Sequence, residues 1–76
     1  MAKLSPFPWK VFEQFLRTVG CSLKRVEASH RVYWKDGLHR PRIIQAKGNV
    51  PVFIILNNLR TLGIDREMYL SILETL

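Results

Sequence analysis

The sequence predicts a small α+β domain in which helices cover one face of a three-stranded antiparallel sheet. Apolar residues near the N-terminus recur with helical spacing, and a segment rich in β-branched and aromatic residues follows them. Inside that segment Asp36-Gly37 is typical of a hairpin turn, and the last third of the chain returns to helical spacing. This order suits one sandwich of helices on a sheet. With 76 residues, the whole chain, 1–76, is expected to form a single domain.

The first helix is expected to begin after Ser5 and to end at Gly20. Serine is a favourable N-cap, and Pro6 fits the first helical turn. Glycine commonly follows the last residue of a helix. The apolar residues that share one helical face are Trp9, Phe12, Phe15, Leu16 and Val19.

Three strands are expected over residues 21–27, 30–35 and 38–45, with Pro41 favouring an edge position or a bulge. A two-residue turn at Asp36-Gly37 would place Tyr33 opposite Arg40 and Arg31 opposite Arg42. In that register one face, expected to pack on the core, carries Val32, Trp34 and Ile43. The other face is expected to carry the basic and aromatic residues Arg31, Tyr33, Lys35, Arg40 and Arg42.

Two further helices are expected after a short loop. Pro51 opens the first of them and Gly63 ends it, while Asp65 is expected to cap the second. The residues expected to be buried are Val52, Ile55, Leu56, Leu59, Leu62, Met68, Ile72, Leu73 and Leu76.

The charge of the chain favours a polyanionic partner. The formal net charge is +6, with twelve basic and six acidic residues. Residues 1–48 carry ten basic and three acidic side chains, a net +7, whereas residues 49–76 carry two and three, a net −1. Nucleic acid, an acidic protein or an anionic membrane surface would each match this charge. The basic sheet face is then either a phosphate-binding surface, with Tyr33 stacking on a base, or a solvated surface with no ligand.

Several other chemistries are not supported by the sequence. Cys21 is the one cysteine, so neither a disulfide nor a cysteine cluster for zinc can form within the chain, and its place after a helix end disfavours a thiolate. No close pair of acids suits a metal-dependent nuclease, and no glycine-rich phosphate loop is present. We therefore expect no metal and no cofactor. No signal-peptide or membrane-spanning stretch is seen, which favours a reduced, cytoplasmic protein without a membrane partner.

His30 is the most specific candidate for chemistry. Histidine titrates near neutral pH, and RNA carries a 2′-hydroxyl beside each phosphate, so one imidazole could move protons during RNA cleavage without a metal. A single histidine at the start of a strand is more often structural, and the predicted register turns His30 toward the core. His39, beside the turn, is expected to be a surface residue.

The chain resembles the HicA (YcfA-like) toxins, which are small mRNA interferases with a fold similar to double-stranded-RNA-binding domains. The resemblance covers about residues 4–76. It rests on the order and spacing of Gly20, Arg25, Ser29-His30, Asp36-Gly37, Pro51, Leu59 and Gly63-Ile64. It implies an αβββα sandwich with an extra short C-terminal helix, His30 as the catalytic residue, and an acidic HicB-type antitoxin as partner. With the charge pattern, we expect RNA contacts from Arg25, Ser29, Arg31, Tyr33, Lys35, Arg40, Arg42 and Lys47.

The chain departs from the family pattern at three places. Gln45 stands where the family has a histidine ahead of the second helix. Ala28 stands where the family has the glycine of Gly-Ser-His, which is strained if that position has a positive φ. Val52-Phe53-Ile54 replaces the usual Lys-Gly-Thr, so Phe53 or Ile54 either extends the core or forms a protein interface. A non-catalytic RNA-binding or protein-interaction module of the same fold therefore stays open, as does a homodimer.

Overall fold

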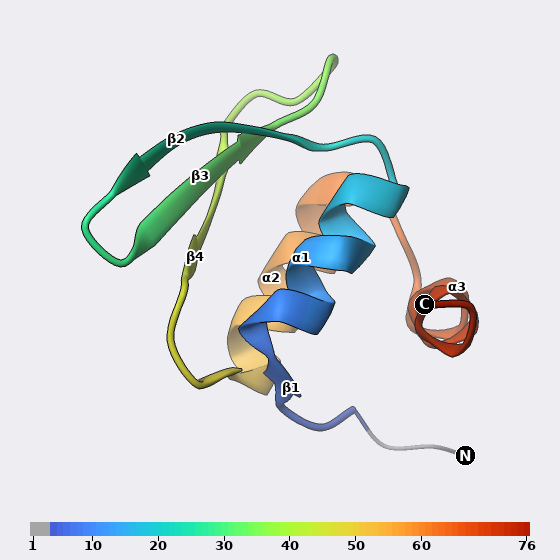
Figure 1. The fold of residues 1–76 in the computed structure, drawn as a ribbon. Helices are drawn as coiled ribbons and strands as arrows, with labels where there is room; N and C mark the ends of the chain where they lie inside the picture. Colours follow the sequence, from blue (N-terminus) through green and yellow to red (C-terminus); the bar gives the residue numbers. More distant parts are fainter. Residues whose placement is uncertain (1–3) are drawn as a thin grey trace.

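A computed structural model describes residues 4–76, so the first three residues of the predicted domain lie outside the described part. Strands β2, β3 and β4 form an antiparallel sheet in that order, and β1 pairs with β5. Helices α1 and α2 lie on one side of the three-stranded sheet, and α3 lies beyond them (Figure 1). The predicted α+β fold with three helices and a three-stranded antiparallel sheet is confirmed. The elements are β1 (Phe7–Pro8), α1 (Trp9–Thr18), β2 (Ser22–Glu27), β3 (His30–Trp34), β4 (Arg42–Gln45), β5 (Asn49–Val50), α2 (Val52–Leu62) and α3 (Arg66–Glu74).

Helix α1 begins later than the sequence predicts. Phe7 and Pro8 are held as a short strand against Val50 and Asn49, so the helix starts at Trp9 and Ser5 is not its cap. The start of the helix is tied to the distant loop by the Trp9 amide, which donates to the carbonyl of Gly48 at 3.1 Å. The buried face is as predicted, since Phe12, Phe15 and Leu16 are fully buried.

The hairpin between β2 and β3 turns at Ala28 and Ser29, between the paired residues Glu27 and His30. Ala28 has a φ of +53°, the one positive φ among the described residues other than glycine. The left-handed region favours glycine because a Cβ crowds the backbone there. Ala28 therefore has the positive φ at which the sequence predicts strain.

The register of β3 and β4 differs from the prediction. The predicted turn at Asp36-Gly37 does form, since the Leu38 amide donates to the Lys35 carbonyl at 3.1 Å, but the ladder does not continue directly from it. Tyr33 pairs with Arg42 and Val32 with Ile43, two residues further along than predicted. Residues 35–41 form a longer connection, which includes Pro41, a residue without an amide hydrogen for the ladder. The third strand is accordingly shorter than the predicted 38–45.

The opposite face of the sheet from the predicted one packs against the helices. Tyr33 and Ile44 belong to the core, with 0% and 2% of their surfaces exposed, whereas Ile43 is 50% exposed. Val32 is shielded too, but it lies outside the core cluster. The assignment of Val32, Trp34 and Ile43 to the core face was therefore wrong. The predicted basic face is the one that faces α1 and α2.

Helix α2 ends and helix α3 begins where the sequence predicts, with differences in which residues they bury. Gly63 closes α2 at a φ of +70°, and the Asp65 carboxylate accepts from the Met68 amide at 2.8 Å at the start of α3. Tyr69, which the sequence did not single out, is fully buried, whereas Met68, Leu56 and Leu76 are exposed. Tyr69 lies edge-on to Phe15, with 4.8 Å between ring centroids.

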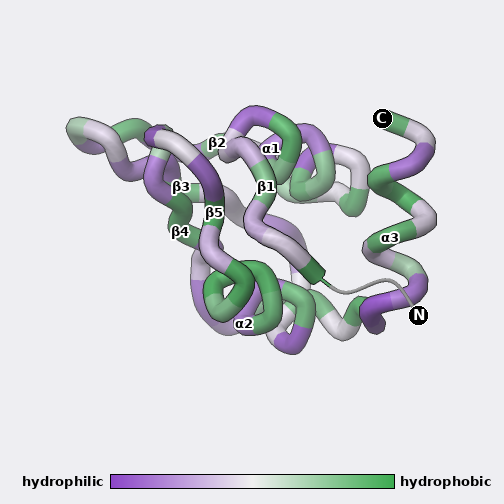
Figure 2. Tube along the Cα trace, turned by 90° about the horizontal axis from the view of Figure 1, so that it is seen from below, coloured by the Kyte–Doolittle hydropathy of each residue, from purple (hydrophilic) through white to green (hydrophobic). Residues whose placement is uncertain are grey.

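The first turns of α2 are strongly hydrophobic, while α3 alternates between hydrophobic and hydrophilic residues (Figure 2). Ile55 and Leu59 carry the buried side of α2, and the side chain of Phe53 is 70% exposed. Phe53 therefore does not extend the core. Within residues 4–76, no helix is both long and apolar enough to cross a membrane.

Candidate functional site

His30 lies at the start of β3, directly after the strained turn at Ala28, and its side chain is exposed. It points away from the core because Tyr33, three residues on, occupies the face that meets the helices. The expectation that His30 leans toward the core is therefore wrong. The turn beside it is held in place by the Ala46 amide, which donates to the carbonyl of Ser29 at 2.6 Å.

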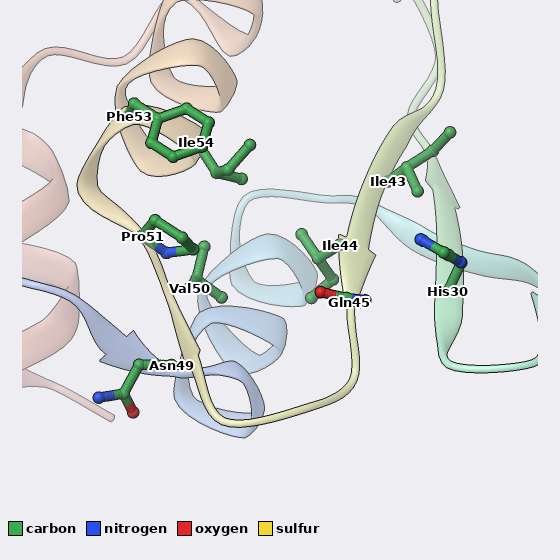
Figure 3. Close-up of a pocket in the computed structure, with 9 residues that line it drawn as sticks. All are labelled: His30, Ile43, Ile44, Gln45, Asn49, Val50, Pro51, Phe53 and Ile54. Carbon is green, nitrogen blue, oxygen red and sulfur yellow. The ribbon is translucent and has the colours of Figure 1, made fainter.

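His30 lines an open cleft of about 380 Å³, called here the histidine cleft. One wall is β4 with the neighbouring His30, and the other is formed by β5 and the start of α2 (Figure 3). Phe53 and Ile54 stand across the gap from the residues of β4 (Figure 3). The residues that line the cleft are His30, Ile43, Ile44, Gln45, Asn49, Val50, Pro51, Phe53 and Ile54.

Among residues 4–76, His30 is the one titratable residue that lines the histidine cleft, and two amides accompany its imidazole. Gln45 pairs directly with His30 across the β3–β4 ladder, and Asn49 lies at the far end of the loop 46–48 that follows Gln45. Amide side chains both donate and accept hydrogen bonds, so they can orient a phosphate or a base. An exposed imidazole beside such groups has the chemistry of a general acid or base. The apolar wall at Phe53 and Ile43 offers contact area for a ring or an apolar side chain.

Three predicted RNA contacts lie near the histidine cleft. Ser29 precedes His30, and the exposed Lys47 follows shortly after Gln45 in the loop that leads to β5. Arg25 is exposed on β2 and shares a sheet face with Glu27, the residue paired with His30. The Arg25 guanidinium lies 3.2 Å from the Glu27 carboxylate. This exposed ion pair leaves Arg25 accessible to a ligand, since such pairs are weak in water.

Arg31 and Tyr33 do not form the predicted RNA surface. Tyr33 is fully buried, and its hydroxyl donates to the Glu13 carboxylate of α1. The Nε of Arg31 donates to the same carboxylate at 2.9 Å, and its guanidinium lies 5.2 Å from the centre of the Trp9 ring. Burial raises the pKa of Tyr33 to about 12, with a further contribution from the hydrogen bond to Glu13. These contacts hold α1 to β3, so Tyr33 cannot stack on a base.

The remaining predicted cations lie at the other end of the sheet. Lys35 follows the end of β3 and is half-buried, with its aliphatic stem beside Gly20. Arg40 is exposed in the connection before β4, and Arg42 is 9% exposed under α2. The predicted face of five basic and aromatic residues is therefore divided into a buried cluster and a separate group around Arg42.

Neither a metal nor a thiolate is supported by the described residues. No group of three histidine, cysteine, aspartate or glutamate side chains within residues 4–76 is arranged to hold a metal ion. Cys21 is buried, and burial raises the pKa of its thiol, which favours the unreactive protonated form.

The cleft residues Gln45, Asn49 and Phe53 were not predicted as part of the site. They come together only when β4 and the start of α2 face each other across the loop 46–48. Two signals were present in the sequence. Gln45 stands where the resembled family has a histidine, and Phe53 lies off the apolar stripe of its helix. Comparison of the chain with protein-family models, curated proteins and solved structures finds no match.

Proposed function

We propose that this chain is a metal-independent endoribonuclease of the HicA type, which cleaves messenger RNA as the toxin of a toxin–antitoxin pair. The observation that carries the proposal is the position of His30, an exposed imidazole at an open cleft beside amide side chains. The arrangement of helices on one face of a three-stranded sheet is consistent with a fold like the double-stranded-RNA-binding domain. The net charge of +6 suits an RNA ligand.

In the proposed reaction His30 moves a proton at the scissile phosphate. The imidazole accepts the proton of a 2′-hydroxyl while the 2′-oxygen bonds to the adjacent phosphorus and the bond to the 5′-oxygen breaks. The products are a 2′,3′-cyclic phosphate and a 5′-hydroxyl, and the leaving oxygen takes up a proton. Gln45 and Asn49 would donate to the phosphate oxygens, and Phe53 would support a neighbouring base.

The cations at the edge of the histidine cleft would hold the RNA backbone. Arg25 and Lys47 are exposed on either side of His30, and Ser29 stands next to it. Contacts of this kind position the RNA without reading its sequence, and each contributes to the salt dependence of binding. Lys35 would meet only RNA that extends to the far end of β3.

An acidic antitoxin would cover the same cleft. Complementary charge speeds encounter with a basic partner, and an apolar side chain of the antitoxin would pack on the exposed Phe53 and Ile43. The partner should therefore copurify when its gene is co-expressed and should compete with RNA.

The test is RNA cleavage in the presence of EDTA by wild type, His30→Gln and His39→Gln. The His30→Gln variant should lose about 10²–10⁴-fold in rate, because glutamine cannot relay a proton. His39→Gln is the matched control, since His39 is exposed in the connection before β4 and lies outside the histidine cleft. RNA with a 2′-deoxyribose at the cut site should resist. Unchanged cleavage by His30→Gln would refute the role of His30.

The exposure of Phe53 favours a second candidate, a protein-interaction module that does not cleave RNA. Phe53 and Ile43, which are 70% and 50% exposed, line the same cleft, and exposed apolar surface of this kind is typical of a binding site. If wild type cuts no RNA but binds an acidic partner, and Phe53→Ser abolishes that binding, the second candidate replaces the first.

A further inference from the structure

Arg42 is a buried cation without an acidic partner. Its side chain extends from β4 toward α2, and 9% of its surface is exposed. The ion pairs among residues 4–76 involve Glu13 and Glu27, and neither acid pairs with Arg42. Burial lowers the pKa of Arg42, and the charge of the nearby Arg40 lowers it further. A buried charge with only neutral partners is costly, so an anion at this place would stabilise it.

A second pocket of about 260 Å³ adjoins Arg42, called here the arginine pocket. Arg40 and Arg42 line it together with Gly37, Leu38 and His39 of the β3–β4 connection and with Asn57 and Thr61 of α2. No acidic side chain lines it. Two cations, one imidazole and two neutral polar groups therefore face one small space.

The donors of the arginine pocket are only partly used within the protein. Arg42 donates from Nε to the Pro41 carbonyl at 3.1 Å and from Nη1 to the Thr61 hydroxyl at 3.0 Å. A guanidinium has five N–H groups, so donors remain for a ligand. The Thr61 hydroxyl accepts from Arg42, which leaves its own hydrogen to donate, and the Asn57 amide adds two more.

We propose that the arginine pocket binds a phosphate group through Arg40, Arg42, Asn57 and Thr61. Planar guanidinium groups match the oxygen geometry of phosphate, and hydroxyl and amide donors complete its coordination. A purely structural role for Arg42, offsetting the C-terminal dipole of α2, accounts for its contact with Thr61. It does not account for Arg40, because a second positive charge at the same pocket raises the cost of burying Arg42.

The arginine pocket is separate from the histidine cleft, so the inference does not rest on the proposed nuclease. Arg42 pairs with Tyr33, whereas Gln45 at the other end of β4 pairs with His30. Three residues of a strand span about 10 Å, and residues 42 and 45 point to opposite faces. Two kinds of ligand could supply this phosphate group, namely a free small phosphate compound and a nucleic acid with a terminal phosphate.

The test is a titration of the isotope-labelled full chain with inorganic phosphate at constant ionic strength. Binding is monitored by nuclear magnetic resonance through the chemical shifts of the backbone amides. We expect saturable shifts at Gly37, Asn57 and Thr61. Arg40→Gln and Thr61→Val should each weaken binding by about tenfold, since a hydrogen bond to a charged group is lost. Both residues are exposed, so both variants should fold. Arg42→Lys, which keeps the charge but not the planar group, should weaken it similarly.

The matched control is Arg60→Gln, which removes the same charge from the exposed residue next to Thr61 but outside the pocket. The proposal would be overturned if Arg60→Gln weakened phosphate binding as much as Arg40→Gln does. It would also be overturned if the chemical-shift changes were scattered over the surface or absent. A DNA tetranucleotide with a 5′-phosphate is then compared with inorganic phosphate and with the same tetranucleotide carrying a 5′-hydroxyl. If the phosphorylated tetranucleotide binds more tightly than both, the natural ligand is the terminal phosphate of a nucleic acid. Binding of phosphate but of neither oligonucleotide identifies a small phosphate compound. His30→Gln should bind phosphate as wild type does, so a failed cleavage assay leaves this result intact.

Discussion

Replacing Ala28 by glycine should stabilise the domain, although glycine substitutions usually destabilise. Ala28 has a φ of +53° in the two-residue turn between β2 and β3, and its side chain is exposed. The substitution therefore removes strain without removing a buried contact. The turn itself is retained because the paired residues Glu27 and His30 and the hydrogen bond from Ala46 to Ser29 do not involve the Ala28 methyl group.

The magnitude follows from two opposing terms. The left-handed region costs a residue with a Cβ about 1–2 kcal/mol relative to glycine. Glycine in turn makes the unfolded chain more flexible, which costs about 0.4–1 kcal/mol of stability. The difference is a gain of about 0.8 kcal/mol. A domain of this size should then melt about 3–6 °C higher.

Urea unfolding followed by circular dichroism measures this gain. With a slope of about 1 kcal/mol per molar, the midpoint should rise by about 0.8 M. The matched control is Ala46→Gly, at the same corner of the domain but without a positive φ, which should lower the midpoint instead. If Ala28→Gly lowers the midpoint as Ala46→Gly does, the strain argument is refuted. The Ala28→Gly variant should also cleave RNA at least as fast as wild type, because the turn positions His30.

Two further predictions concern the aromatic residues. The pKa of each of the two tyrosines, Tyr33 and Tyr69, is raised to about 12, chiefly by burial. A raised pKa means that the folded state holds the proton more tightly, so this stability is present below pH 10 and is lost as the pH rises toward 12. An ultraviolet titration should show little tyrosinate near pH 10 while the fold persists, and half-ionisation there in folded protein would contradict the burial of both rings. Phe53→Ser should change the unfolding free energy by about 0.5 kcal/mol or less, because Phe53 is 70% exposed. Phe15→Ala removes a fully buried ring and should lower the unfolding free energy by about 3–5 kcal/mol. A similar decrease for Phe53→Ser would contradict the exposure of the Phe53 ring.

Local physics accounts for what the sequence alone predicts correctly. The buried positions Phe12, Phe15 and Leu16 follow from a period of 3.6 residues. The end of α2 at Gly63 and the cap at Asp65 depend on backbone groups a few residues away. The turn at Ala28 lies between two predicted strands, at a position where the resembled family has glycine, so a positive φ could be anticipated there, whereas the exposure of His30 could not.

The choice of the buried sheet face was decided only by the tertiary structure. Both faces of β3 carry large side chains in alternation, so periodicity separates the two faces without showing which one meets the helices. The Tyr33 hydroxyl can be buried because Glu13, twenty residues earlier on α1, accepts its hydrogen bond. The length of the connection before β4 sets the register that places Arg42 beneath Thr61. The order of elements was thus determined by local preferences, whereas the two pockets depend on contacts between residues far apart in the chain.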